Sequence, residues 1–202
     1  MAGGDTQEDT GCTMSGTPER FVTERLVLRK PRVEDAEAIF EGYAQDPEAV
    51  RYLVFTPYSE VEPVREWLRG RIEAWEGGED LSWVLTYPEE DRCLGMVALR
   101  LQGCKADVGY VLARAHWGKG LMPEAVRAVV QWALTQPEIY RVWAVCDIDN
   151  VGSRRVMEKV GMECEGVLRR WGIHPNVSAE PRDVWCYSIV KSSREVSNDG
   201  EY

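Results

Sequence analysis

The sequence predicts an α/β fold in which helices cover both faces of one mixed, mostly antiparallel sheet. Residues 81–87 and 93–102 are two apolar strands around a short polar turn, which predicts an antiparallel hairpin. Further on, the strand 106–113 is followed by a glycine-containing loop, a helix over 122–135 and the strand 140–148. This βαβ order predicts that the strands 106–113 and 140–148 run parallel.

The remaining elements follow the same strand and helix periodicities. They are a strand over 21–31, helices over 33–44 and 150–160, and strands over 164–173 and 182–191. A further helix ends at Gly77 and Gly78, and Ser59 and Glu62 stand before it at the spacing of a capping box. Gly161 is a natural residue to end the helix that precedes it.

The chain has 202 residues, which suits one domain. We place this domain at 19–191, between the polar segments 1–18 and 192–202, which we expect to be a disordered N-terminal tail and a flexible C-terminal tail. Hydrophobic residues make up 44% of the sequence, so a sizeable core is expected. The longest apolar runs are too short to span a membrane, and the first twenty residues lack the pattern of a signal peptide.

Charge and cysteine usage narrow the class of protein. The net charge of −10 argues against nonspecific binding to nucleic acid, which needs a basic face. The six cysteines are scattered without a CxxC pair, so the sequence indicates neither a disulfide framework nor a zinc site. We therefore expect a reduced, cytoplasmic protein without a structural metal.

The stretch HWGKGLMPEA, residues 116–125, has the composition of an anion site. Gly118 and Gly120 stand just before a helix start, where unpaired N–H groups attract phosphate. The order of residues fits neither a P-loop nor a full dinucleotide fingerprint, because Lys119 precedes Gly120 and position 123 is Pro. A plain glycine turn before a helix explains the stretch equally well.

Taken with VGYVLA before it and NVGSRRVMEKVGM at 150–162, this stretch resembles the GNAT superfamily of acyl-CoA-dependent N-acetyltransferases. Within that superfamily it is similar to the RimJ/RimL-like branch of ribosomal-protein alanine acetyltransferases. The resemblance runs from about Glu24 to Lys191. It implies a single-domain GNAT fold in which the strands 106–113 and 140–148 splay apart, with acetyl-CoA as the acyl donor.

The resemblance also implies which residues contact the cofactor. The main-chain amides of 118–123 would hold the CoA pyrophosphate, and the end of the strand 106–113 would pair with pantetheine. The residues concerned are Tyr110, Val111, Leu112, Trp117, Gly118, Lys119, Gly120, Leu121, Met122, Asn150 and Ser153. Trp117 and Met122 depart from the general family pattern but fit the branch. Asn150 can equally be the N-cap of the following helix.

Acyl transfer from a thioester needs a proton for the departing thiolate and N–H donors for the oxyanion. Many family members place a Tyr at the position of Met157 as the acid, and methionine cannot donate a proton. The resemblance implies Ser153 as its substitute, although the serine hydroxyl can also serve only a free helix amide. Strand amides near Leu112 are the expected oxyanion donors.

The base that deprotonates the amine stays open. Asp107 lies on the strand 106–113, and His174 lies in an irregular segment between the last strands. An imidazole ordinarily titrates near pH 6.5, which suits proton transfer, but a loop histidine is more often just exposed. Other acids near that half of the sheet are Glu163, Glu165 and Asp183. A water chain can replace any single base.

The sequence therefore predicts an N-acetyltransferase that moves an acetyl group to a primary amine, either a protein N-terminus or a small molecule such as a polyamine, aminoglycoside or amino acid. The alternative is a non-catalytic acyl-CoA-binding sensor or interaction module. Lys119, Arg154 and Arg155 either contact the cofactor phosphates or are solvated charges. The tryptophans expected in the core are 67, 75, 83, 132, 143 and 185. Trp171 is expected to line the acceptor pocket.

Overall fold

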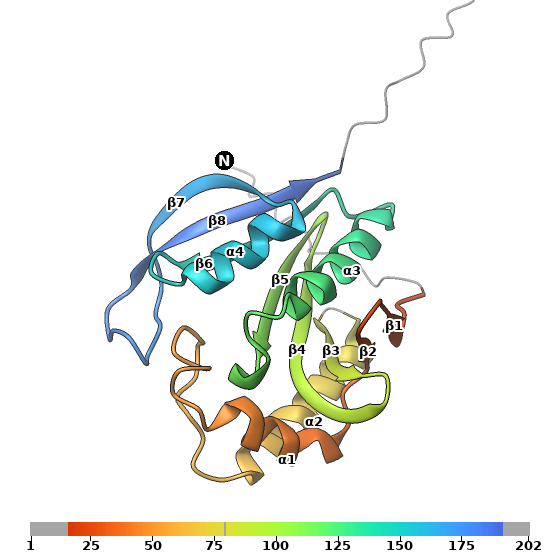
Figure 1. Ribbon diagram of the computed structural model, residues 1–202. Coiled ribbons are helices and arrows are strands. Elements are labelled where there is room, and N and C mark those ends of the chain that lie inside the picture. Colours follow the sequence, from red (N-terminus) through yellow and green to blue (C-terminus); the bar gives the residue numbers. More distant parts are fainter. Residues whose placement is uncertain (1–15, 79, 192–202) are drawn as a thin grey trace, which may run out of the picture.

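The computed structural model describes residues 16–78 and 80–191, so most of the segment 1–18 and all of 192–202 lie outside the described residues. One sheet runs through the molecule in the order β1-β2-β3-β4-β5-β6-β8-β7. Adjacent strands of this sheet are antiparallel, except that β5 and β6 are parallel. Helices α1 and α2 pack on one face, and α3 and α4 lie on the other (Figure 1). The predicted α/β fold with a mixed sheet is confirmed.

The elements alternate along the chain as the periodicity predicts. The strands are β1 Arg20–Val22, β2 Val27–Arg29, β3 Asp80–Tyr87, β4 Glu90–Gln102, β5 Lys105–Leu112, β6 Arg141–Asp147, β7 Glu163–Gly172 and β8 Arg182–Val190. The α-helices are α1 Ala36–Ile39, α2 Glu62–Gly77, α3 Leu121–Thr135 and α4 Val151–Val160. Short 3₁₀ turns occupy Val33–Asp35 and Arg114–His116, and a π-helical turn occupies Phe40–Ala44.

The strand predicted over 21–31 is wrong as a single element, because the chain folds back on itself there as β1 and β2. The Thr23 hydroxyl accepts a hydrogen bond from the Leu26 N–H (3.1 Å), and the Thr23 N–H donates to the Leu26 carbonyl (2.9 Å). A threonine side chain that satisfies a nearby backbone amide favours a turn over a continuous strand. The alternation of apolar residues does not report this local competition.

Two helix predictions also need correction. The helix expected over 33–44 is present, but it is built from 3₁₀, α and π pieces rather than one regular helix. The capping box of Ser59 and Glu62 does not form, because α2 begins only at Glu62 and Val61 takes the N-cap position without a side-chain hydrogen bond. At the other end Gly78 adopts a left-handed φ of 77°, as the predicted glycine stop requires.

The main core lies between the sheet and the helices α3 and α4. Trp83 is buried in this core, and Trp75, from the last turn of α2, extends the same cluster through an edge-to-face contact with Trp83, with ring centroids 5.0 Å apart. The Trp83 indole N–H donates to the Pro18 carbonyl (2.9 Å), which ties the start of the described chain to the sheet. Trp132 and Trp185 pack partly buried against the same core.

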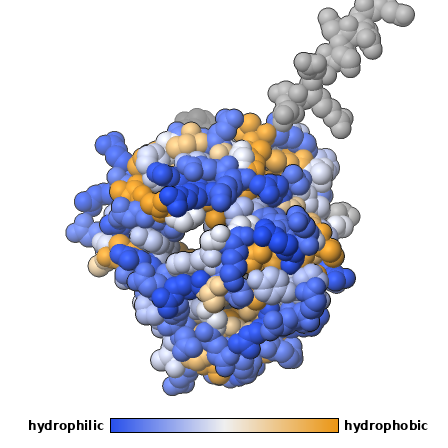
Figure 2. Space-filling view, in the orientation of Figure 1, coloured by the Kyte–Doolittle hydropathy of each residue, from blue (hydrophilic) through white to orange (hydrophobic). Residues whose placement is uncertain are grey.

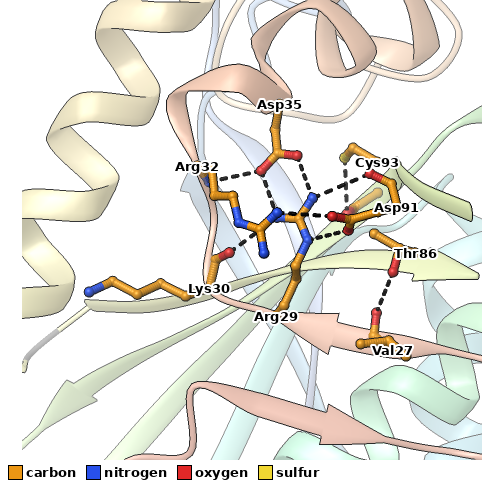
Figure 3. A network of polar contacts seen from close by, with 9 residues as sticks. Val27, Arg29, Lys30, Arg32, Asp35, Thr86, Asp91 and Cys93 are labelled. Atoms are coloured by element: carbon orange, nitrogen blue, oxygen red, sulfur yellow. Dashed lines mark hydrogen bonds and ion pairs between the residues drawn. The ribbon is translucent and has the colours of Figure 1, made fainter. Parts of the chain in front are cut away.

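A buried ion pair joins the sheet to the segment that precedes α1 (Figure 3). The Arg29 guanidinium on β2 binds both oxygens of Asp35 (2.6 and 2.9 Å) and one oxygen of Asp91 (2.5 Å). The Arg29 and Asp35 side chains are 9% and 6% exposed, whereas Asp91 is 57% exposed. Hydrogen bonds from Arg29, partly opposed by desolvation, hold the pKa of Asp91 below its ordinary value. The bidentate geometry fixes the angle at which the chain leaves the sheet.

Within residues 16–78 and 80–191, no helix is long and apolar enough to cross a membrane. The apolar surface of these helices is directed to the two sides of the sheet.

Replacing one partner of the buried pair should be costly. We expect Asp35→Ala to lower the free energy of unfolding by about 3–5 kcal/mol, because Arg29 would keep its charge in a buried place without its main partner. The matched variant Asp91→Ala removes an exposed carboxylate from the same arginine and should cost about 0–1 kcal/mol. Urea unfolding of the three proteins measures both values, and equal losses for the two variants would contradict this ranking.

Candidate active site

The site is built around a gap between β5 and β6. The two strands pair only at their starts, through Lys105 with Arg141, Ala106 with Val142, and Asp107 with Trp143. Beyond these pairs neither strand has the other as its neighbour, so the sheet opens between them (Figure 1). The expected splay is confirmed.

The hydrogen-bonding register of β5 with β4 decides which backbone groups of β5 face the gap. The Ala113 N–H donates to a β4 carbonyl (2.8 Å), and alternate residues of an antiparallel ladder turn their backbone groups to the same neighbour. Val111 therefore turns its backbone groups to β4, while Tyr110 and Leu112 turn theirs to the gap. The Leu112 carbonyl already accepts a hydrogen bond from the Trp117 indole N–H (2.7 Å). The Leu112 N–H and both backbone groups of Tyr110 face the gap.

The first of two cavities, the glycine-loop cleft, has a volume of about 640 Å³ and lies between the gap and the starts of α3 and α4. It is lined by every predicted cofactor residue except Lys119: Tyr110, Val111, Leu112, Trp117, Gly118, Gly120, Leu121, Met122, Asn150 and Ser153. Gly118 and Gly120 both adopt a left-handed φ of 75°. Glycine takes this conformation without strain, so the loop can present its amides and the free N–H groups of α3 to the cleft.

Sequence reasoning missed the contacts that hold this loop. The Arg25 guanidinium donates to the carbonyls of Lys119 (2.9 Å) and Gly120 (3.3 Å). Glu124, in the first turn of α3, binds the same guanidinium (2.7 Å) and the Thr23 hydroxyl (2.6 Å). Arg25 lies about a hundred residues away in the chain, so no local pattern reveals the contact.

Three cations line the glycine-loop cleft: Arg51, Arg155 and Lys159. Arg155 was predicted, whereas Lys119 and Arg154, predicted with it, do not line the cleft. Lys159 was missed, although its spacing of four residues from Arg155 puts both on one face of α4. Arg51 comes from the segment between α1 and α2, which carried no signal for this role.

The second cavity, the aromatic cavity, has a volume of about 350 Å³ and lies mainly on the sheet face that α1 and α2 cover. The space-filling view shows a hollow near the middle of the molecule (Figure 2). Six residues line both cavities: Tyr52, Leu53, Tyr110, Val111, Asn150 and Ser153. The two cavities therefore meet at the gap between β5 and β6.

Ser153 lies at this meeting point. Its hydroxyl is 2.9 Å from the Tyr110 hydroxyl, and its N–H donates to the Asn150 side chain (3.1 Å), so Asn150 is the N-cap of α4. Burial raises the pKa of Tyr110, which keeps its hydroxyl protonated. Met157 is fully buried in the main core and lines neither cavity. The hydroxyl pair is therefore the proton-bearing group at the junction of the cavities.

His174 is oriented rather than freely exposed. Its side chain is 12% exposed, and its Nδ1 lies 2.9 Å from the Tyr52 carbonyl. A carbonyl only accepts hydrogen bonds, so Nδ1 carries the proton and Nε2 of the neutral ring carries a lone pair. Nε2 is buried without a hydrogen-bond partner, 3.9 Å from Asp147, and the ring lines the aromatic cavity.

Asp107 also lines the aromatic cavity, but its carboxylate binds Arg100 (2.5 and 2.8 Å). The other acids considered lie outside both cavities. Glu165 pairs with Arg141 and Ser188, and these hydrogen bonds lower its pKa to about 2. Asp183 accepts a hydrogen bond from the Arg170 N–H (2.8 Å), and Glu163 is exposed.

Two of the tryptophans predicted to lie in the core, Trp67 and Trp143, line the aromatic cavity. Trp171, expected to line an acceptor pocket, lines this cavity together with Trp143. The ring centroids of Trp143 and Trp171 lie 6.5 Å apart. Trp67 lines the same cavity from α2. Among the described residues, no cluster of three or more His, Cys, Asp or Glu side chains is placed to hold a metal ion.

Comparison with known proteins agrees with this geometry. Residues 25–163 match the family described as acetyltransferase (GNAT) domain. The uncharacterized N-acetyltransferase YoaA of Bacillus subtilis is 30% identical over 172 residues, which cover 84% of this chain and 95% of YoaA. The ribosomal-protein-serine acetyltransferase of Escherichia coli is 25% identical over 112 residues, 54% of this chain and 62% of that protein.

Among solved structures, RimL, a ribosomal L7/L12 α-N-protein acetyltransferase in complex with coenzyme A, superposes with a TM-score of 0.75. The match covers 84% of this chain and 96% of RimL at 19% identity, and so shows a shared fold. With two thirds of the chain inside the family match and the β5–β6 gap in place, this protein belongs to the GNAT family and is an acetyltransferase with relatives among the ribosomal-protein acetyltransferases.

Proposed function

We propose that this acetyltransferase moves the acetyl group of acetyl-CoA to a primary amine by direct attack in a ternary complex. The observation that carries the proposal is the meeting of two cavities at Tyr110 and Ser153. One cavity has the amides and cations that a phosphorylated cofactor needs, and the other is separate space for an acceptor. Both reactants can then be bound at once, as in-line transfer requires.

The glycine-loop cleft suits CoA from end to end. The pyrophosphate would lie at the start of α3, where the free N–H groups and the helix dipole favour negative charge. Arg51, Arg155 and Lys159 would face the phosphates. The pantetheine amides would pair with the backbone groups of Tyr110 at the gap, which leaves the Leu112 N–H free for the thioester oxygen. The CoA complex of RimL, which shares the fold, supports this choice of cofactor.

The reaction follows from the groups at the junction. The Nε2 lone pair of His174 takes a proton from the ammonium group of the acceptor, and the neutral nitrogen then attacks the thioester carbon. The carbonyl oxygen becomes an oxyanion that the Leu112 N–H stabilises. The nitrogen of the tetrahedral intermediate is now positively charged and loses its second proton to water. The C–S bond then breaks, and the Ser153 hydroxyl passes a proton to the departing thiolate while it takes that proton back from the hydronium ion. His174 finally gives its proton to solvent, so that one proton is released for each amide formed.

Asp107 is the weaker base in this proposal, because protonating it would break its ion pair with Arg100. Ser153 needs only modest acidity, since a thiol ordinarily has a pKa of about 8.5 and its thiolate leaves readily. We place the reaction in the cytoplasm. The cysteines of the described residues are all unpaired, which suits a reducing compartment.

The sensor alternative differs from this proposal in one measurement. A catalyst releases free CoA thiol when it meets acetyl-CoA and a suitable amine, whereas a sensor only binds acetyl-CoA. The relatives named as N-acetyltransferases favour catalysis.

The glycine loop can be tested by binding. We expect Gly120→Asp to weaken CoA binding by at least about a hundredfold, because a side chain and a negative charge would meet the pyrophosphate. Gly103→Asp is the matched control, since Gly103 also has a positive φ of 58° but lies in the turn between β4 and β5. Titration calorimetry with CoA measures both, and unchanged affinity in Gly120→Asp would rule out this placement.

The Ser153 hydroxyl can be tested by kinetics. If it protonates the thiolate, Ser153→Ala should lower kcat by roughly 10²-fold with little change in acetyl-CoA affinity. Ser153→Thr keeps a hydroxyl and should retain more activity than Ser153→Ala. A loss of affinity without a loss of kcat would instead make Ser153 a binding residue.

The base can be identified from pH–rate profiles. kcat/KM should rise with pH on an acidic limb, and His174→Ala should remove this limb and lower kcat/KM by roughly 10²-fold or more. Asp107→Asn should keep the acidic limb and should lower kcat/KM less than His174→Ala does. A larger loss in Asp107→Asn would make the aspartate the base. If neither variant loses more than about tenfold, water rather than a side chain removes the proton.

A further inference from the structure

The structure points to an acceptor class. We infer that the aromatic cavity selects a small arylalkylamine, a primary amine on a short chain attached to a flat ring that carries one hydrogen-bonding group, rather than a protein N-terminus, a polyamine, an aminoglycoside or an amino acid. This inference rests on the proposed function, because it takes the aromatic cavity as the acceptor site.

Flat side chains surround the cavity from several elements. The aromatic residues that line it include Tyr52, Phe55, Tyr58, Trp67, Trp143 and Trp171. They come from the segment between α1 and α2, from α2, from β6 and from β7. Aromatic rings prefer edge-to-face or offset contacts with another ring, and such contacts add to the energy of burial. At about 350 Å³ the cavity lies at the small end of the usual range for ligand pockets, about 300–1,000 Å³.

The charged groups of the cavity are already paired with one another or with neighbours. Arg100 binds Asp107, and Arg71 binds Asp80. Asp147 binds Arg182 through both carboxylate oxygens (2.5 and 3.1 Å). A polyamine or aminoglycoside would need surplus carboxylates here, and an amino acid would need a surplus cation. The paired charges therefore favour an acceptor whose only charge is its reacting ammonium group.

The polar atoms left without partners indicate what the acceptor must carry. Seven buried side-chain polar atoms in the described part of the chain have no hydrogen-bond partner, and four of them belong to residues of this cavity: Tyr43, Ser82, Trp143 and His174. A buried polar group without a partner is costly, so a ligand that supplies one gains affinity. His174 Nε2 matches an amine donor, whereas the Trp143 indole N–H requires an acceptor atom.

A peptide would find few backbone partners in this cavity. The cavity lies against a face of the sheet, at Ser82, Ala98 and Gly109, where strands present side chains and not free backbone groups. The segment between α1 and α2 also has few free carbonyls, because side chains from the segment between β7 and β8 bind them. Asn176 donates to the carbonyls of Val50 (2.8 Å) and Phe55 (2.8 Å). His174 binds the carbonyl of Tyr52 (2.9 Å). An extended N-terminus normally needs such groups to pair with its own backbone.

The first experiment compares amines with the wild-type protein. The panel holds 2-phenylethylamine, its three ring-hydroxylated isomers, spermidine, kanamycin, glycine and a serine-initiated hexapeptide, and the readout is CoA thiol release. We expect the best arylalkylamine to exceed each of the last four in kcat/KM by at least about tenfold, and at least one hydroxylated isomer to exceed 2-phenylethylamine. A higher kcat/KM for the peptide, spermidine, kanamycin or glycine overturns the inference and leaves the proposed function intact.

The second experiment removes one donor. Trp143→Phe keeps a ring but loses the indole N–H, so it should abolish the advantage of the hydroxylated isomer over 2-phenylethylamine, a factor of roughly ten for one hydrogen bond. Trp185→Phe removes another buried indole N–H without a partner, from a residue outside both cavities, and should leave the advantage unchanged. An advantage that survives in Trp143→Phe contradicts the role of this donor.

Binding separates the two proposals. Calorimetry of the hydroxylated isomers against the protein saturated with CoA should show binding to the wild type. Binding without CoA release from acetyl-CoA would support the cavity assignment and overturn the transferase proposal. If no arylalkylamine binds but another amine causes CoA release, the arylalkylamine inference is overturned and the transferase proposal is supported.

Discussion

The parallel contact between β5 and β6 is the constraint on which the rest of the site depends. It lasts for three residue pairs and then stops, and a sheet that opens in this way leaves backbone groups of β5 without a neighbouring strand. Such groups are costly to bury unpaired, so the gap is a place where a ligand is favoured. The glycine loop follows the open end of β5 and α4 follows that of β6. Both the glycine loop and the start of α4 therefore lie beside the gap, because each directly follows one of the two strands that separate there.

Residues distant in sequence hold the two reactant cavities in shape. Arg25 and Glu124 join the start of the chain to the glycine loop, while Arg29 and Asp35 fix how the chain leaves the sheet toward α1. His174 and Asn176 reach from the last loop to the segment between α1 and α2. Each contact satisfies a backbone carbonyl or a charge that would otherwise be exposed or unpaired. Contacts between residues far apart in the chain therefore hold the walls of both cavities.

The electrostatics of the two cavities differ in a way that suits two different ligands. The glycine-loop cleft combines free helix amides with Arg155 and Lys159. Its two acidic residues, Glu48 and Asp149, are paired with Arg51 and Arg182, so the cleft favours an anion. In the aromatic cavity every charged side chain is paired: Arg100 with Asp107, Arg71 with Asp80, and Asp147 with Arg182. The polar atoms of this cavity that have no hydrogen-bond partner belong to neutral groups. A neutral, ring-lined space disfavours water and extra charge, which strengthens the hydrogen bonds made inside it. Ser153 and Tyr110 stand where these two environments meet.

The sequence by itself predicted the α/β class and the parallel pair, because these depend on periodicity and on the order of the elements. Its resemblance to the GNAT superfamily indicated ten of the residues that line the glycine-loop cleft, Ser153 among them. The sequence also indicated Trp171, which lines the aromatic cavity. Tertiary structure decided the rest, including the turn at Thr23, the exclusion of Lys119 from the cleft, the Arg25 contact, the burial of Met157 and the tautomer of His174. These features depend on contacts between residues far apart in the chain. A side chain's partner, and hence its charge state and direction, is set by packing that no local pattern records.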